Sequence, residues 1–170
     1  MWKGKRERNR MDVRLFPEPL YERHEPRIME LLTDVFTVNH IADGKAAVSL
    51  ATEKAMALKH YLADGSALLI GAFEGEQLVG FAWFYSYEFC GSQRLHLTEI
   101  AVISAFRSQG IAKKMICCAE KIAAQRGICE IDLYTAPDNK AALHVYQELG
   151  FIASRVHLVK KLKEKQDGNF

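Results

Sequence analysis

The sequence lacks a long apolar run, a paired cysteine motif and a large excess of charge of one sign. No apolar stretch approaches the ~20 residues of a membrane-spanning helix, and the basic start is not followed by the apolar stretch of a secretory signal. The net charge is +2, although residues 1–10 carry five cations against one acid. The remaining chain is therefore mildly acidic, which argues against a nucleic-acid surface. These absences favour a cytoplasmic protein with neither nucleic acid nor membrane as partner.

The cysteines and histidines show no metal-binding pattern. Cys90, Cys117, Cys118 and Cys129 form no CxxC pair and stand in otherwise apolar segments, so we expect buried free thiols. The histidines share no spacing suited to a metal ion, and no metal is expected.

The chain has the length and composition of one globular domain. It has 170 residues, of which 49% are apolar and 26% charged. A chain of this length can be built around a single hydrophobic core, and this composition is ordinary for a globular domain. We expect a disordered basic extension over residues 1–10, one domain over residues 11–160 and a polar tail over residues 161–170.

Apolar periodicity predicts helices mixed with strands. The predicted helices cover residues 26–36, with Pro26 in the first turn, 50–62, 111–123 and 139–149, the last capped by Asp138. The predicted strands cover residues 67–73, 78–87, 95–102, 129–135 and 151–159. This order indicates an α/β (α+β) fold in which helices flank a mixed sheet.

Residues 107–112, Arg-Ser-Gln-Gly-Ile-Ala, join a predicted strand to a predicted helix. The first amides of a helix have no internal partner, and glycine lets a phosphate approach them without a metal. The pattern is neither a Walker A motif nor GxGxxG. By spacing alone, an ordinary helix start is the alternative interpretation.

The context of this loop adds a family resemblance. Residues 97–102, Leu-Thr-Glu-Ile-Ala-Val, followed by Arg107-x-x-Gly110-x-Ala112, resemble motif A of the GNAT superfamily of acyl-CoA-dependent N-acyltransferases. Residues 136–151, which begin Ala-Pro-Asp-Asn and end Leu-Gly-Phe, resemble motif B of that superfamily. The likeness is specific over residues 97–151 and rests on element order elsewhere. It implies a GNAT-like mixed central sheet with helices on both faces.

The resemblance also implies acetyl-CoA as the acyl donor. Backbone groups near Val102 would line its pantetheine arm, and Asn139 would stand beside the pantetheine and the leaving sulfur. The loop and the helix start would hold the pyrophosphate through Arg107, Ser108, Gln109, Gly110, Ile111, Ala112 and Lys113.

The same resemblance makes Tyr146 the group that protonates the departing thiolate, a transfer that a phenol can perform when both groups are close and shielded from water. Packing beneath Phe151 is the alternative role. A base or a water chain must also remove a proton from the acceptor amine. Glu99 is our first choice and His96 the second, although strand alternation separates them onto opposite faces unless a bulge intervenes. On the neighbouring strand, Phe81, Trp83, Tyr85 and Tyr87 alternate. Aromatic residues of a strand most often belong to the core. One wall of an acceptor pocket is the alternative role of this set.

We therefore expect an acetyl-CoA-dependent N-acetyltransferase that works by direct attack in a ternary complex. A small-molecule amine is favoured slightly over a protein N-terminus or lysine as the acceptor. A CoA-binding sensor module without transfer activity is the alternative from a different class. The chain after Phe151 has room for about one strand, whereas many relatives have two there. A homodimer is therefore one alternative for the assembly.

Overall fold

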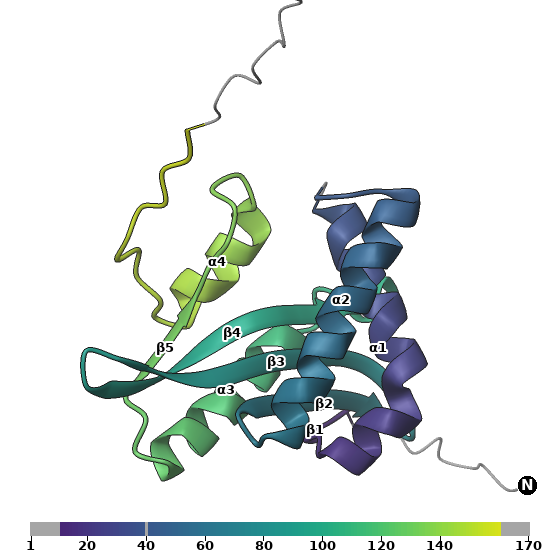
Figure 1. Ribbon diagram of the computed structural model, residues 1–170, viewed down its shortest axis with the longest axis horizontal. Helices are drawn as coiled ribbons and strands as arrows, with labels where there is room; N and C mark the ends of the chain where they lie inside the picture. The colour runs from purple at the N-terminus through teal and green to yellow at the C-terminus, as the bar shows by residue number, and fades with distance from the viewer. Residues whose placement is uncertain (1–10, 40, 161–170) are drawn as a thin grey trace, which may run out of the picture.

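The computed structural model describes residues 11–39 and 41–160, and its strands form one five-stranded sheet in the order β1-β2-β3-β4-β5 (Figure 1). The strands are β1 (Met11–Leu15), β2 (Ala67–Glu74), β3 (Gln77–Phe89), β4 (Ser92–Val102) and β5 (Glu130–Leu133). The helices are α1 (Glu18–Val38), α2 (Gly44–Ala63), the 3-10 turn η1 (Ser104–Phe106), α3 (Ile111–Gln125) and α4 (Lys140–Glu148). Strands β1 to β4 pair antiparallel, and β4 pairs parallel with β5. The expected fold class is confirmed.

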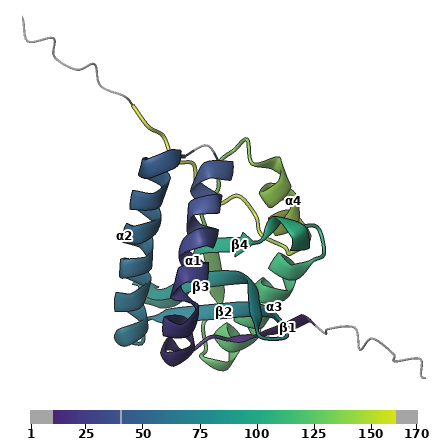
Figure 2. The ribbon, with the colours of Figure 1, turned by 90° about the vertical axis from the view of Figure 1, so that its right-hand side faces the viewer.

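Two apolar cores lie on opposite faces of the sheet. Helices α1 and α2 cover one face and α3 covers the other (Figures 1 and 2). The alternation of β3 divides its residues between them, since Phe81 and Trp83 join the α1–α2 core while Ala82 and Phe84 join the α3 core. Burying a phenylalanine side chain such as Phe81 or Phe84 contributes about 1.5–3 kcal/mol. Because β3 buries such a side chain on each of its faces, it stabilises both layers of the fold.

Strands β3 and β4 approach each other closely just before the chain leaves the sheet. A Cβ atom on Gly80 would lie 2.8 Å from the carbonyl oxygen of Ala101, a distance that real Cβ atoms essentially never show. The backbone amide of Ile103 then donates to the carbonyl of Val79 at 2.9 Å. The end of β4 is therefore held rigidly where η1 and the loop to α3 begin.

Strands β4 and β5 separate partway along their length. Their pairing runs from Arg94 opposite Glu130 to Leu97 opposite Leu133. Strand β4 continues to Val102, so within the described residues its second half has no partner on the β5 side. Backbone groups on that edge remain available to a ligand.

The first helix differs from its prediction, because α1 begins at Glu18 and Pro26 lies inside it rather than in its first turn. Tyr21 and Ile28, seven residues apart, are both buried on the same side of α1. Pro26 itself is exposed, so water can bond the carbonyl that its missing N–H leaves free. Packing therefore extends the helix through the proline.

The C-terminal part corrects two further predictions. Asn139, rather than Asp138, caps α4, since its side-chain oxygen accepts from the amide of Ala142 at 3.2 Å. The strand predicted over residues 151–159 is absent, and Ile152, Val156 and Leu158 are exposed there. A β-prone segment becomes a strand only beside a free sheet edge, and this segment pairs with none in the structure.

The remaining differences lie at turns and at the sheet edge. All four cysteines are free, but Cys90 and Cys129 are exposed because both lie next to strand ends. Cys117 and Cys118 are only half-buried on α3. Strand β1, where the sequence predicts no element, adds an edge to the sheet. No helix among the described residues is long and apolar enough to span a bilayer.

Candidate functional site

The loop before α3 presents a row of backbone amides. Gly110 is the N-cap of α3 with φ of 74°, and Ser108 also has a positive φ of 59°. Within the described part of the chain, no acceptor bonds the amides of residues 108–113, and no side chain caps the helix. A Cβ atom on Gly110 would meet nothing within 4 Å, so the approach to these amides is open. Free N–H groups and the positive end of the helix dipole favour an anion here.

The polar side chains of this loop fold back onto the protein. The Nε of Arg107 donates to the carbonyl of Val102 at 2.9 Å, and its guanidinium pairs with Asp34 of α1. The side-chain amide of Gln109 donates to the carbonyl of Ala105 at 3.2 Å. Arg107 therefore links the loop to α1 and leaves the amides as the exposed polar surface.

Lys113, in the first turn of α3, pairs with Glu148 of α4. This hydrogen-bonded ammonium holds the pKa of Glu148 below its usual value. The pair joins the amide row to the helix that carries Tyr146, while Asn139 begins that helix as its N-cap. The helices of the two sequence motifs, α3 and α4, are therefore neighbours in the structure (Figure 2).

A bulge in β4 changes which side chains share a face. Trp83 of β3 is opposite Glu99, whereas the next residue, Phe84, is opposite Leu97, so Thr98 is the extra residue. Tyr85 is opposite His96. Because Trp83 and Tyr85 share a face, His96 and Glu99 share it too, and simple alternation was wrong about them.

Glu99 is nearly buried beneath α2. Its side chain is 12% exposed, and one of its oxygens lies 3.2 Å from the Nζ of Lys54. Burial raises the pKa of Glu99 because it disfavours the charged form, and the ammonium of Lys54 offsets part of that rise. The carboxylate is thus a paired group in a poorly solvated position.

Tyr146 of α4 packs against the apolar core on the α3 face of the sheet. Burial raises the pKa of Tyr146, and the charge of Glu99 raises it further, which keeps the phenol protonated. The ring also packs against Phe151, with centroids 5.6 Å apart. Both roles considered for Tyr146, proton donor and packing residue, are therefore compatible with its position.

His96 belongs to a hydrogen-bonded group that the sequence did not reveal. Its Nδ1 lies 2.6 Å from one carboxylate oxygen of Asp132 in β5, and the hydroxyl of Tyr87 donates to the other oxygen. Burial raises the pKa of Tyr87, and so does its bond to Asp132. The signal that would have identified Asp132 is the parallel β4–β5 register, which places it directly opposite His96.

Aromatic rings surround this group. Tyr61 of α2 stacks on Tyr85 at 5.8 Å between centroids, and His96 lies 5.2 Å from the rings of both Tyr85 and Tyr134. The proposed wall is therefore shorter than expected. Phe81 and Trp83 are 0% and 2% exposed and belong to the core, so Tyr85 and Tyr87 alone of that set reach the surface.

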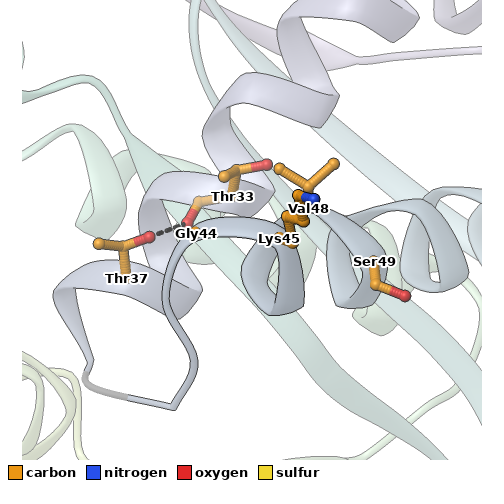
Figure 3. A pocket seen from close by; sticks show the side chains of 6 residues that line it. All are labelled: Thr33, Thr37, Gly44, Lys45, Val48 and Ser49. Carbon is orange, nitrogen blue, oxygen red and sulfur yellow. Dashed lines mark hydrogen bonds between the residues drawn. The ribbon is translucent and has the colours of Figure 1, made fainter.

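A separate depression of about 710 Å³ lies between α1 and α2 (Figure 3). It is lined by Thr33, Thr37, Gly44, Lys45, Val48 and Ser49. The hydroxyl of Thr37 donates to the carbonyl of Thr33 at 2.9 Å, so part of its polar lining is already bonded. None of the sequence-predicted site residues lines it.

Known proteins resemble this chain in sequence and fold. Residues 26–151 match the model of the family described as "Acetyltransferase (GNAT) family". Mycothiol acetyltransferase of Streptomyces scabiei is 32% identical over 88 residues, which cover 52% of this chain and 28% of the relative. N-alpha-acetyltransferase 30 of Schizosaccharomyces pombe is 38% identical over 58 residues, which cover 34% of this chain and 39% of the relative.

A solved structure, described as a predicted acetyltransferase with acetyl-CoA from Clostridium acetobutylicum, has a TM-score of 0.71 to this chain at 17% identity. The match covers 89% of this chain and 96% of that one, and it shows a shared fold. The two curated relatives are matched over only 28% and 39% of their own lengths.

Replacing Glu99 by glutamine is expected to remove a pH-dependent cost to stability. Because folding raises the pKa of this carboxyl, the wild type is destabilised as the pH rises through the interval between the unfolded and folded values. Glu99→Gln carries no such cost, so its free energy of unfolding relative to wild type should increase as the pH rises above the unfolded-state pKa of a glutamate, about 4.3.

Urea unfolding at a series of pH values measures this difference. Glu53→Gln, on the exposed side of α2, is the matched control and should follow the wild type. A difference between Glu99→Gln and wild type that stays constant across the range would contradict the burial of a charged Glu99.

Proposed function

This chain belongs to the acetyltransferase (GNAT) family, and on that premise we propose that it transfers an acetyl group from acetyl-CoA to an amine. The observation that carries the proposal is the open row of unbonded amides at residues 108–113, next to the unpaired edge of β4. Acetyl-CoA supplies the acetyl group as a thioester, with a diphosphate that such amides bind.

Successive residues of the chain would bind successive parts of acetyl-CoA, from the diphosphate to the thioester. The amides from Ser108 to Lys113 would hold the diphosphate. The unpaired backbone near Val102 would bond the amide groups of the pantetheine arm as a neighbouring strand would. Asn139, at the start of α4, would border the end of that path.

Two proton movements complete the proposed reaction. The acceptor must lose a proton before its nitrogen has a lone pair to attack the thioester carbonyl, and Glu99 and His96 are the proton acceptors on the α1–α2 face. Tyr146 would give its hydroxyl proton to the departing sulfur. Direct attack in a ternary complex is favoured over an acyl-cysteine because burial raises the pKa of both Cys117 and Cys118, which keeps them as thiols.

We favour a small-molecule amine as the acceptor because aromatic rings from α2, from β3 and from the segment after β5 surround His96. A protein N-terminus or lysine is the second candidate, supported by the likeness to N-alpha-acetyltransferase 30. Thioester consumption against a panel of small amines and peptides separates the two. Acetyl-CoA binding without turnover on any of them would favour a sensor module instead.

Gly110→Ala is expected to weaken acetyl-CoA binding by roughly tenfold in a calorimetric titration, since a side chain at this φ of 74° strains the loop and crowds the diphosphate. Gly127→Ala is the matched control, because Gly127 has φ of 71°, equally open surroundings and a place at the other end of α3. Equal affinities for the two variants would contradict a diphosphate site at residue 110.

Tyr146→Phe is expected to lower kcat by roughly 10²-fold while the KM for acetyl-CoA changes less than about twofold, because only the proton donor is lost. Steady-state kinetics with saturating amine measures both quantities. Phe151→Leu, which disturbs the packing of the ring but keeps its hydroxyl, should affect thermal stability more than kcat. Equal losses in kcat and acetyl-CoA affinity for Tyr146→Phe would indicate a packing role.

A further inference from the structure

The contact between His96 and Asp132 determines which ring nitrogen carries a proton. An ionised carboxylate only accepts hydrogen bonds, so the Nδ1 that lies 2.6 Å from Asp132 must hold the proton. The neutral ring then has its lone pair on Nε2. The hydroxyl of Tyr87 bonds the second carboxylate oxygen, which stops the carboxylate from rotating away.

The other charged groups near His96 form ion pairs among themselves, so Asp132 pairs with His96. The charged and titratable groups on this face are Lys54 and Tyr61 from α2, Tyr85 and Tyr87 from β3, Arg94 and Glu99 from β4, Glu130 from β5, and Tyr134. Lys54 pairs with Glu99 at 3.2 Å, and Arg94 pairs with Glu130 at 2.6 Å. Of the three carboxylates, Asp132 is the one whose ion-pair partner is the imidazole.

We infer that Asp132 is a positioning residue that holds His96 with Nε2 ready to take the proton of the acceptor ammonium. One N–H bond of the ammonium breaks, a bond from Nε2 to hydrogen forms, and the electron pair stays on the acceptor nitrogen for its attack. The carboxylate of Asp132 then balances the charge of the imidazolium. This inference rests on the proposed acetyl transfer.

Glu99 is less suited to this step because it already balances Lys54. Protonating Glu99 would leave that ammonium, whose side chain is 38% exposed, without its partner. The charge of Glu99 instead attracts the incoming ammonium and keeps the phenol of Tyr146 protonated. His96 lies in the β4–β5 pairing one position before it ends, so its ring stands beside the point where the two strands separate.

The test compares Asp132→Asn with Glu130→Gln. Both variants remove a carboxylate from the same strand, but Glu130 contacts Arg94 rather than His96. With acetyl-CoA and an amine that the wild type acetylates, Asp132→Asn should lose roughly 10²-fold in kcat, and its KM for acetyl-CoA should change less than about twofold. The acidic limb of its pH profile should move to lower pH, and Asp132→Glu should restore part of the rate. Glu130→Gln should keep the wild-type rate and limb.

A second readout requires no turnover. NMR of the ring nitrogens of His96 should show the proton held on Nδ1 in the wild type and in Glu130→Gln, and shared between Nδ1 and Nε2 in Asp132→Asn. Loss of rate with an unmoved limb and an unchanged tautomer would mean a structural role and overturn the inference alone. A wild type that binds acetyl-CoA but acetylates no amine would overturn the proposed function, and the inference with it.

Discussion

The end of the β4–β5 pairing at Leu97 is the constraint on which the candidate site depends. Two parallel strands that stayed paired would satisfy each other's backbone groups along their whole length. Because β5 ends at Leu133 while β4 runs on to Val102, the second half of β4 keeps an unpaired edge. The charge of Glu99, in that second half of β4, also raises the pKa of Tyr146 on α4. The unpaired edge and the Glu99 carboxylate therefore lie on the same half of β4.

The bulge at Thr98 is the second feature on which the candidate site depends, and it lies next to Leu97, where the β4–β5 pairing ends. One additional residue rotates the chain between His96 and Glu99, so that both side chains emerge on the α1–α2 face. The hydroxyl of Thr98 is buried at the bulge and has no hydrogen-bond partner among the described residues. The bulge therefore places a buried polar atom between His96 and Glu99.

Electrostatic pairing organises the surface around these groups. Each acid on the face is matched by a different base, Glu99 by Lys54, Glu130 by Arg94 and Asp132 by His96. Arg107 and Lys113 are likewise paired with acids of α1 and α4, so the loop before α3 is tied to both sides of the molecule. These partially exposed pairs contribute little stability one at a time. Their effect is to fix orientation, since each one joins two separate elements.

Local sequence was sufficient to predict most helices and strands and the helix start that presents the amide row. These depend on apolar periodicity and on Gly110 at the start of α3. The role of Tyr146 was implied by the family resemblance and stays a prediction. Local sequence offered a bulge in β4 only as an alternative and could not predict the contact between His96 and Asp132, because strand register is set by pairing between segments, here 36 residues apart. Local β propensity also predicted a strand over residues 151–159, but this segment pairs with no strand in the structure. Tertiary structure alone decides such features, since hydrogen bonds between strands and the burial of a charge exist only once distant segments meet.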